Sequence, residues 1–191
     1  MSRRSTRARA PAIALSVALG ACGVSCIVHS FTRMPDGKQW TIENLHTNLR
    51  SSYCYDDADA NCREYGRLYT WDAAFQGCES LGHGWRLPTA DEWRQLAKSV
   101  GGAFDDSDDQ GHAAYAALLT GGRTGFNARL GGGRSDNGQY ARLQAHGFYW
   151  TATAIDSTHA WFYNFAQGGQ AIYRQDGGEK ERAFSVRCVR E

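Results

Sequence analysis

The sequence predicts an α+β domain in which two main helices pack on a mostly antiparallel sheet of short strands. Two helical stripes of apolar residues come early in the chain, and short strand-like segments separated by glycines fill it from residue 125 onward. Helices and strands that are segregated along a chain, not alternating, are typical of α+β folds. A length of 191 residues suits one domain or at most two small ones.

The first helix is predicted over residues 71–81. Its apolar residues recur at a spacing of three or four, as expected for a helix with one buried face. They are Trp71, Ala74, Phe75, Cys78 and Leu81. This pattern places Cys78 on the buried side of the helix.

The second helix is predicted to begin at Thr89, directly after Pro88. Glu92 stands three residues after Thr89, which is the spacing of a capping box. The apolar stripe that follows consists of Trp93, Leu96, Ala97 and Val100. Two glycines then end the helix, and a further short helix is expected near residues 113–119.

The strands are predicted from period-two alternation and from the glycines between them. One covers residues 38–42, and the later ones cover residues 125–130, 147–154, 159–165, 170–175 and 183–190. In the last of these, Phe184, Val186 and Cys188 share one face. This alternation places Cys188 in the core.

The N-terminal segment has the anatomy of an export signal. Four arginines precede an apolar run over residues 12–21, which ends in the sequence LGAC at residues 19–22. This ending resembles the lipobox of bacterial lipoproteins, in which the cysteine becomes the lipidated N-terminus. We therefore expect a lipoprotein signal peptide over residues 1–21, lipidation at Cys22, a tether over residues 22–34 and a domain over residues 35–191. An uncleaved membrane anchor over residues 10–28 is the alternative.

The charge of the body argues against nucleic acid as a partner. The chain carries a net charge of +1, but without residues 1–21 it holds 17 basic and 20 acidic side chains. Binding to phosphates needs clustered lysines and arginines. A mildly acidic body with no basic stripe does not supply them.

Four of the six cysteines fall in the predicted domain, and in an oxidising compartment they are expected to form two disulfides. They are Cys54, Cys62, Cys78 and Cys188. Three pairings are possible. We favour Cys54–Cys62, which closes a short polar loop, together with Cys78–Cys188, which joins the first helix to the last strand. A metal site is disfavoured because no CxxC or HxxxH spacing is present, and no cofactor is predicted.

Seven segments, in order, carry a family likeness. They are DGKQWTIENL (36–45), YGRLYTWDAA (65–74), GWRLPTADEW (84–93), GFNARLGGGR (125–134), YWTAT (149–153), AWFYNF (160–165) and FSVRCVR (184–190). Together they resemble the Fibrobacter succinogenes major paralogous domain over nearly the whole chain after the leader. The resemblance implies a C-type-lectin-like fold, similar to those of formylglycine-generating enzymes and retroelement-diversified receptor-binding proteins. It also implies an envelope or secreted location, and it supports the Cys78–Cys188 pairing.

An enzymatic role is not expected. The segment at residues 86–93 resembles part of formylglycine-generating enzymes, but its residues are fully explained as a helix start. A catalytic thiol must be accessible and have a lowered pKa. Cys78 and Cys188 both lie on apolar faces, which disfavours that chemistry.

Calcium binding is not predicted either. Asp57, Asp59 and Asn61 match the first three ligands of an EF-hand loop, but Cys62 and Leu68 stand where glycine and glutamate are needed. A second acidic cluster at residues 105–109 is typical of a solvated loop.

The candidate ligand-binding surface lies in the last third of the chain, which is rich in aromatic residues. Tyrosine, tryptophan, asparagine and arginine are the residues that recognition surfaces employ. The chosen candidates are Trp161, Tyr163, Asn164, Tyr173 and Arg174. Of these, Asn164, Tyr173 and Arg174 are expected to be exposed, and the family resemblance points to the same region.

The sequence thus predicts a lipid-anchored protein of the bacterial cell envelope, in the outer membrane or at the cell surface. Its domain is expected to bind a protein or glycan ligand and no nucleic acid. Two alternatives stay open: a structural or accessory component of an envelope assembly, and a retroelement-diversified receptor-binding protein.

Overall fold

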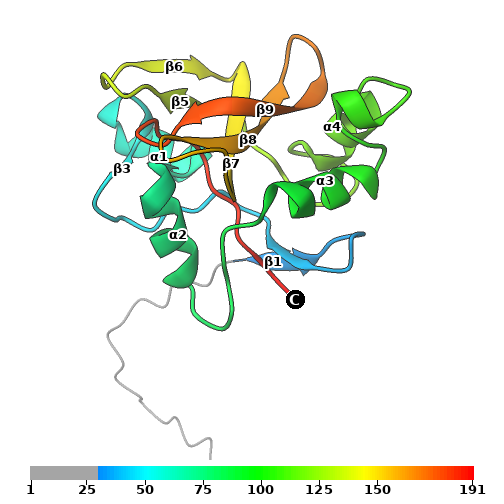
Figure 1. Cartoon of the computed structure of the whole chain (residues 1–191), viewed down its shortest axis with the longest axis horizontal. Coiled ribbons are helices and arrows are strands. Elements are labelled where there is room, and N and C mark those ends of the chain that lie inside the picture. Colours follow the sequence, from blue (N-terminus) through cyan, green and yellow to red (C-terminus); the bar gives the residue numbers. More distant parts are fainter. Residues whose placement is uncertain (1–29) are drawn as a thin grey trace, which may run out of the picture.

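The computed structural model describes residues 30–191 (Figure 1). The expected leader, Cys22 and most of the expected tether lie outside the described residues. The helices are α1 (Asp59–Tyr65), α2 (Trp71–Glu79), α3 (Ala90–Lys98) and α4 (His112–Leu118), with 3-10 turns η1 (Tyr55–Asp57) and η2 (Phe104–Asp106). The strands are β1 (Phe31–Arg33), β2 (Gln39–Thr41), β3 (Ser52–Tyr53), β4 (Leu68–Tyr69), β5 (Gly131–Arg134), β6 (Tyr140–Leu143), β7 (His146–Ala154), β8 (His159–Ala166), β9 (Ala171–Glu179) and β10 (Val189–Arg190).

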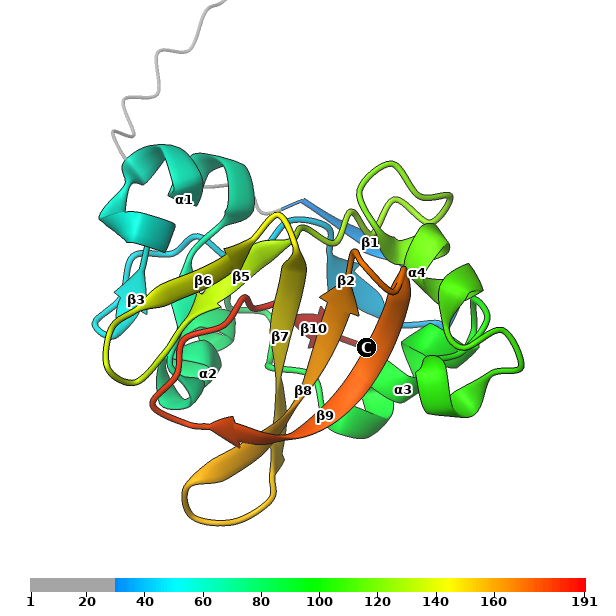
Figure 2. The ribbon, with the colours of Figure 1, turned by 90° about the horizontal axis from the view of Figure 1, so that it is seen from above.

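The largest sheet has five strands in the order β6-β5-β7-β8-β9. All its neighbours pair antiparallel except β5 and β7, which are parallel. Figure 2 shows how strongly β9 curls away from the direction of β7. Two smaller sheets, β1-β2-β10 and β3-β4, complete the fold. The predicted α+β class with a mostly antiparallel sheet is confirmed.

Helices α2 and α3 lie on one side of strands β7–β9, and α4 lies beyond α3 (Figure 1). Around α3 the core is aromatic, because Trp93 packs its ring against those of Trp40, Phe126 and Tyr163 at centroid distances of 5.1–5.7 Å. Burial of such large side chains is the main favourable term in folding. This cluster fixes α3 against the sheet.

A second part of the core forms around α2. Cys78 is fully buried there, together with Trp150 and Phe184, whose rings are 4.5 Å apart. The indole Nε1–H of Trp150 donates to the carbonyl of Tyr69 at 2.8 Å. Of the apolar stripe predicted on the first helix, Ala74 and Cys78 are buried, whereas Trp71, Phe75 and Leu81 are half-buried. The buried face of α2 also includes Ala73 and Gly77.

The predicted capping box at the start of α3 is confirmed. Thr89 Oγ1 accepts a hydrogen bond from the Glu92 backbone N–H at 3.2 Å, and the Glu92 carboxylate accepts one from the Thr89 N–H at 2.9 Å. These two bonds satisfy donors that the first turn of a helix leaves unpaired. The expected short helix near residues 113–119 is also present, as α4.

Two segments differ from expectation. The polar stretch between Cys54 and Cys62, predicted as a loop, contains η1 and the beginning of α1. No regular strand covers residues 125–130, and the strand is instead β5, built from Gly131, Gly132 and Gly133 with Arg134. Gly132 has φ +64°, and a Cβ there would lie 2.5 Å from the carbonyl oxygen of Ala141. A glycine run usually weakens a strand, so composition does not indicate this one.

The segment expected as one strand over residues 183–190 is regular only at β10. Before it, the chain runs between two neighbours: the Phe184 N–H donates to the Tyr69 carbonyl, and the Ser185 N–H donates to the Phe148 carbonyl. Residues 183–189 are all buried. Cys188 is therefore in the core as predicted, but the polar side chain of Arg187 is buried as well.

Candidate functional site

Strands β8 and β9 carry the five predicted ligand-binding residues but do not present them on one surface. Tyr163 pairs across the sheet with Arg174, and Asn164 pairs with Tyr173. Opposed residues of neighbouring strands share a face, whereas consecutive residues of one strand point to opposite faces. The predicted set is thus divided between the two faces of the sheet.

Tyr163 and Asn164 are buried, so the prediction that Asn164 is exposed was wrong. The ring of Tyr163 stacks on Trp93 with centroids 5.5 Å apart, and its hydroxyl donates to the Ala90 carbonyl. Asn164 lies against β7, where its Oδ1 is 3.0 Å from Nδ1 of His146. Because β8 runs between β7 and β9, its middle residues are covered by neighbours that the sequence pattern does not reveal.

Trp161, Tyr173 and Arg174 are the candidates that reach the surface, at the edge formed by β9. Arg174 is exposed, and its guanidinium carbon lies 4.9 Å from the ring centroid of Trp161. The half-buried ring of Tyr173 stacks on Phe104 of η2 at 4.9 Å. These four residues form two pairs, Trp161 of β8 with Arg174 and Phe104 with Tyr173. Because Tyr173 and Arg174 are consecutive in β9, the two pairs lie on opposite faces of the sheet at its edge, and we call them together the β9 edge patch.

A salt bridge borders the patch. Arg94 of α3 donates to both carboxylate oxygens of Asp106, with the shortest distance 2.6 Å. The hydrogen bond and charge of Arg94 hold the pKa of Asp106 below its usual range, and Arg174 acts in the same direction. Phe104 was not among the predicted residues, because it stands beside acidic residues in a stretch predicted as a loop.

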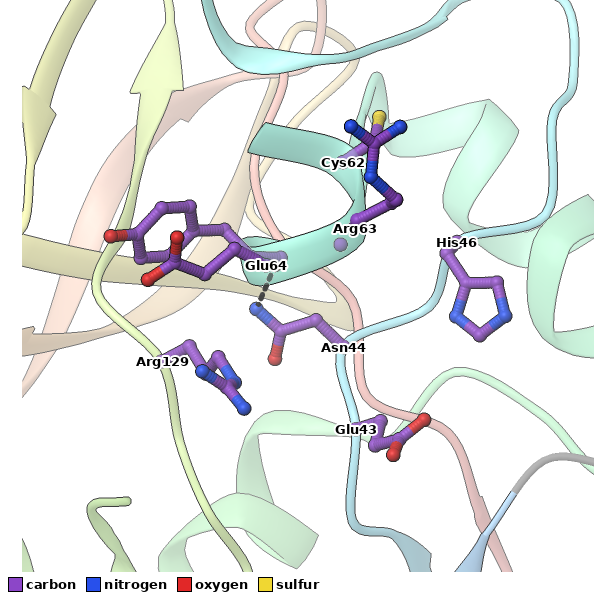
Figure 3. A pocket seen from close by; sticks show the side chains of 9 residues that line it. Glu43, Asn44, His46, Cys62, Arg63, Glu64 and Arg129 are labelled. Carbon is purple, nitrogen blue, oxygen red and sulfur yellow. Dashed lines mark hydrogen bonds between the residues drawn. The ribbon is translucent and has the colours of Figure 1, made fainter. Parts of the chain in front are cut away.

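A second candidate site is a cavity of about 400 Å³ that the sequence did not indicate (Figure 3). Arg63 and Glu64 come from α1, Glu43 and Asn44 come from the segment after β2, and Arg129 comes from the chain before β5. Figure 3 shows the charged side chains arranged around Asn44. No spacing signal links these residues, since they lie in three distant parts of the chain.

The floor beneath this cavity is a buried polar network around Arg187. Its Nε–H donates to Asn44 Oδ1 at 2.8 Å, and its Nη atoms donate to the carbonyls of Thr41, Phe126 and Asn127 at 2.7–2.8 Å. The Tyr149 hydroxyl lies 2.7 Å from the Arg129 carbonyl, to which it donates its one proton, and 3.1 Å from Asn44 Oδ1. Burial lowers the pKa of Arg187 to about 10, so the side chain remains charged at neutral pH.

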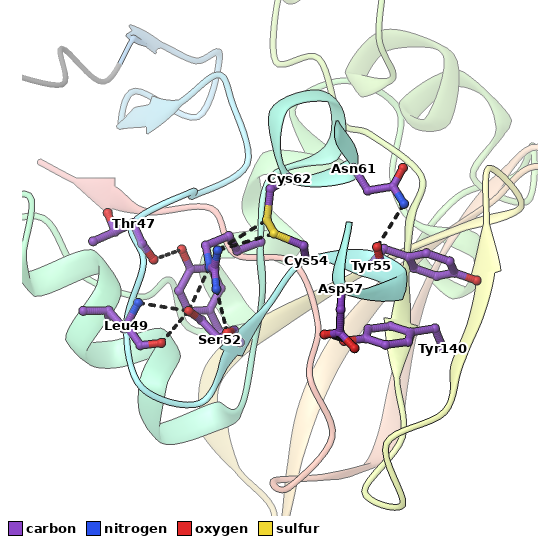
Figure 4. The surroundings of a disulfide bond; sticks show 11 residues. Thr47, Leu49, Ser52, Cys54, Tyr55, Asp57, Asn61, Cys62 and Tyr140 are labelled. Carbon is purple, nitrogen blue, oxygen red and sulfur yellow. Dashed lines mark hydrogen bonds between the residues drawn. A yellow bond between two sulfur atoms is a disulfide. The ribbon is translucent and has the colours of Figure 1, made fainter. Parts of the chain in front are cut away.

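Both predicted disulfides are present. Cys54 is bonded to Cys62 at the rim of the cavity (Figure 4), and Cys78 is bonded to Cys188 in the core. The guanidinium of Arg67 lies over the first of these, with Nη1 3.4 Å from Cys54 Sγ and 3.5 Å from Cys62 Sγ. Two disulfides place the protein among extracytoplasmic ones, because such bonds persist in oxidising compartments.

The residues that resemble the start of an EF-hand loop are used in local structure. Asp57 accepts a hydrogen bond from the Tyr140 hydroxyl at 2.6 Å, and the Asn61 side chain donates to the Tyr55 carbonyl at 2.9 Å (Figure 4). Within residues 30–191, no group of three or more His, Cys, Asp or Glu is placed to hold a metal ion. The same part of the chain contains no helix that is long and apolar enough to span a membrane.

Fold and disulfides together define a disulfide-stabilised α+β domain of an extracytoplasmic protein. Residues 30–190 match the model of the Fibrobacter succinogenes major domain, and the chain belongs to this family. No curated protein and no solved structure matches the chain. The family resemblance predicted from the seven segments is confirmed.

Proposed function

We propose that this protein is a lipid-anchored component of the bacterial cell envelope whose C-type-lectin-like domain binds a protein or glycan ligand at the cell surface. Membership in the family and the two disulfides support a location outside the cytoplasm. The LGAC sequence at residues 19–22 supports lipidation of Cys22. The arrangement of α2 and the last strand, joined by Cys78–Cys188, supports the lectin-like topology.

The β9 edge patch is the observation that carries the binding role. Trp161 and Tyr173 offer rigid rings at the rim of the sheet, and each is held by a neighbour, Arg174 or Phe104. Aromatic and arginine side chains that are already ordered lose little entropy on binding. They are also the residue types that contribute most to recognition surfaces.

Binding is favoured over catalysis by the state of the cysteines. All four cysteines within residues 30–191 are in disulfides. An oxidation chemistry like that of the formylglycine-generating enzymes needs a reactive thiolate. In this protein the same cysteines hold the domain together.

The binding role is tested with the full chain on a glycan array and in pull-downs from membranes of the native host. We expect a ligand signal that is lost when Trp161→Ala and Arg174→Ala are combined. Arg142→Ala, at an exposed position of β6, is the matched control and should keep the signal. A ligand whose binding is unchanged by the double substitution contradicts the assignment to the β9 edge patch. A stoichiometric protein partner that the double variant still captures favours an accessory role in an envelope assembly.

Lipidation is tested by intact mass spectrometry of the protein recovered from membranes. We expect a chain that begins at Cys22 and carries acyl chains, and a Cys22→Ser variant that is not lipidated. A recovered chain with its leader uncut contradicts this part of the proposal.

A further inference from the structure

The cavity beside the Cys54–Cys62 disulfide has the features of a preformed small-molecule site. Its volume of about 400 Å³ falls within the range of ligand pockets, roughly 300–1,000 Å³. Cys62 lines it, so the disulfide fixes one wall. Gly66 fixes another, because it has φ +78° and a Cβ there would lie only 2.6 Å from Asn44 Cβ. The walls are therefore set by covalent and backbone geometry.

The residues at the base of the cavity are equally constrained. Asn44 is buried, and both ends of its amide form hydrogen bonds. Its Nδ2 donates to the Tyr65 carbonyl and to Ser185 Oγ, and its Oδ1 accepts from Nε of Arg187. The backbone of Arg129 is held from both sides, since its N–H donates to the Tyr149 hydroxyl and its carbonyl accepts from it, each at 2.7 Å. The base of the cavity is therefore ordered, whereas the side chains of Glu43, Arg63 and Glu64 are exposed at its mouth.

The charges around the cavity are of both signs and do not neutralise one another. Within residues 30–191, the side chains of Glu43, Arg63, Glu64 and Arg129 form no salt bridge with each other or with other groups. Arg63 and Glu64 extend from neighbouring positions of α1, and Arg129 faces them from another segment (Figure 3). Opposite charges that are not paired with each other around a concave surface suit a ligand that itself carries both charges.

Arg187 adds a fixed positive field beneath this arrangement. Its guanidinium is fully buried, and its hydrogen-bond acceptors are neutral: three backbone carbonyls, the Asn44 amide and the Tyr149 hydroxyl. Within residues 30–191 no carboxylate forms a salt bridge with Arg187, and the field of such a buried charge is only weakly screened. Arg129 and Glu43 are close enough to act on the charge of Arg187. The field therefore reaches the cavity, where it favours an anionic group next to Arg129.

We propose that the cavity bounded by Glu43, Asn44, Arg63, Glu64 and Arg129 binds a small zwitterion of the size of a free amino acid or dipeptide. The carboxylate of the ligand pairs with the guanidinium of Arg129, which can form a planar bidentate contact with it. The buried guanidinium of Arg187 lies beneath this position. The ammonium group pairs with Glu64 and Glu43. This site shares no residue with the β9 edge patch, so either proposal can fail without the other.

The test is calorimetric titration of the full chain, with both disulfides intact, against a panel of free L-amino acids and glycyl dipeptides. We expect at least one member to bind. Its N-acetyl derivative, which lacks the ammonium group, and its methyl ester, which lacks the carboxylate, should each bind at least tenfold more weakly. Equal binding of the N-acetyl derivative would reduce the cavity to an anion site and overturn the proposal, as would a panel without any binder.

Variants locate the binding. Arg129→Gln and Glu64→Gln are each expected to weaken binding at least tenfold, whereas Arg142→Gln, at an exposed position of β6, should leave it unchanged. Thermal unfolding of each variant checks that the fold is retained, and Arg63→Gln provides a further test from α1 if one of them does not fold. Binding that persists in both cavity variants places the ligand elsewhere and overturns the assignment.

Discussion

The two disulfides lie in contrasting parts of the molecule. Cys78–Cys188 joins residues 110 apart in sequence, and both of its cysteines are fully buried. Cys54–Cys62 joins residues only 8 apart, and Cys62 is partly exposed at the rim of the cavity. The first bond lies in the core, between α2 and the last segment of the chain. The second encloses only η1 and the beginning of α1.

This contrast indicates that the two disulfides stabilise different parts of the protein. Closing a long loop removes much more freedom from the unfolded chain than closing a short one. The core bond therefore stabilises the whole fold, together with the buried Arg187 next to it. The rim bond acts locally, where it holds α1 and one wall of the cavity in place.

Removing the core disulfide should have the largest effect. In the chain-entropy model, a loop of this length is worth about 5 kcal/mol. We expect Cys78→Ala with Cys188→Ala to lower the free energy of unfolding by about that amount, measured by urea denaturation. A loss below about 1 kcal/mol would show that the long loop is already restrained without the bond.

Arg187→Met should rank next, at about 4 kcal/mol, because it leaves the carbonyls of Thr41, Phe126 and Asn127 buried without donors. Arg187→Lys should also destabilise the protein, since an ammonium group cannot reproduce the planar fork of donors. Denaturation of both variants beside the wild type measures the effect. Full stability of the lysine variant would mean that charge, and not geometry, is what this position requires.

Removing the rim disulfide should cost less, about 2.5 kcal/mol in the same model. The double variant Cys54→Ala with Cys62→Ala should remain folded and show faster amide hydrogen exchange within α1. Equal losses from the two disulfide variants would contradict the distinction drawn between the core and the rim.

Acid should lower the stability of the protein by protonating Glu92, which forms salt bridges with Arg86 and Lys38 near the last strand. Burial acts to raise the pKa of Glu92, but hydrogen bonds from Arg86 and the Thr89 backbone, with the charges of Arg86 and Lys38, outweigh it and hold the pKa at about 2. The unfolded chain protonates this group near 4.5, so it binds more protons than the native state between these values. The shift corresponds to about 3 kcal/mol, which solvent around the exposed Arg86 side chain reduces to about 2 kcal/mol. We expect this stability to be present above pH 4.5 and lost as the pH falls towards 2. Glu92→Gln should flatten this part of the stability profile, and an unchanged acid slope would exclude Glu92 as its source.

The smallest effect concerns the rate of reduction. In the native protein, a reducing agent should cleave Cys54–Cys62 before Cys78–Cys188, because Cys62 is partly exposed whereas Cys78 and Cys188 are fully buried. The positive charge of Arg67 beside both rim sulfurs stabilises a thiolate leaving group. Arg67→Met should slow this first step several-fold, as followed by alkylation and mass spectrometry. Earlier reduction of the core bond would reverse the comparison.

Local patterns in the sequence predicted α2, α3 and α4, but not α1. The favoured pairing of the cysteines was one of three possible pairings, and the family resemblance supported it. The stripe that begins at Trp71 and the Thr89–Glu92 capping box depend on residues within a few positions of each other, so one segment contains the whole signal. Period-two alternation likewise placed Cys188 in the core. The family likeness rests on seven such segments in order.

Only the tertiary structure decided which polar residues are buried and where a ligand can be held. Arg187 and Asn164 look like surface residues in sequence, yet both are buried. Asn164 lies in β8, between β7 and β9, whereas Arg187 lies in an irregular segment and its guanidinium is hydrogen-bonded to three distant backbone carbonyls. The cavity brings together Glu43, Arg63 and Arg129, which no periodicity connects. The physical reason is the distance along the chain over which each interaction acts. Helix periods and caps depend on residues a few positions apart, whereas burial and shared surfaces arise from packing between distant segments.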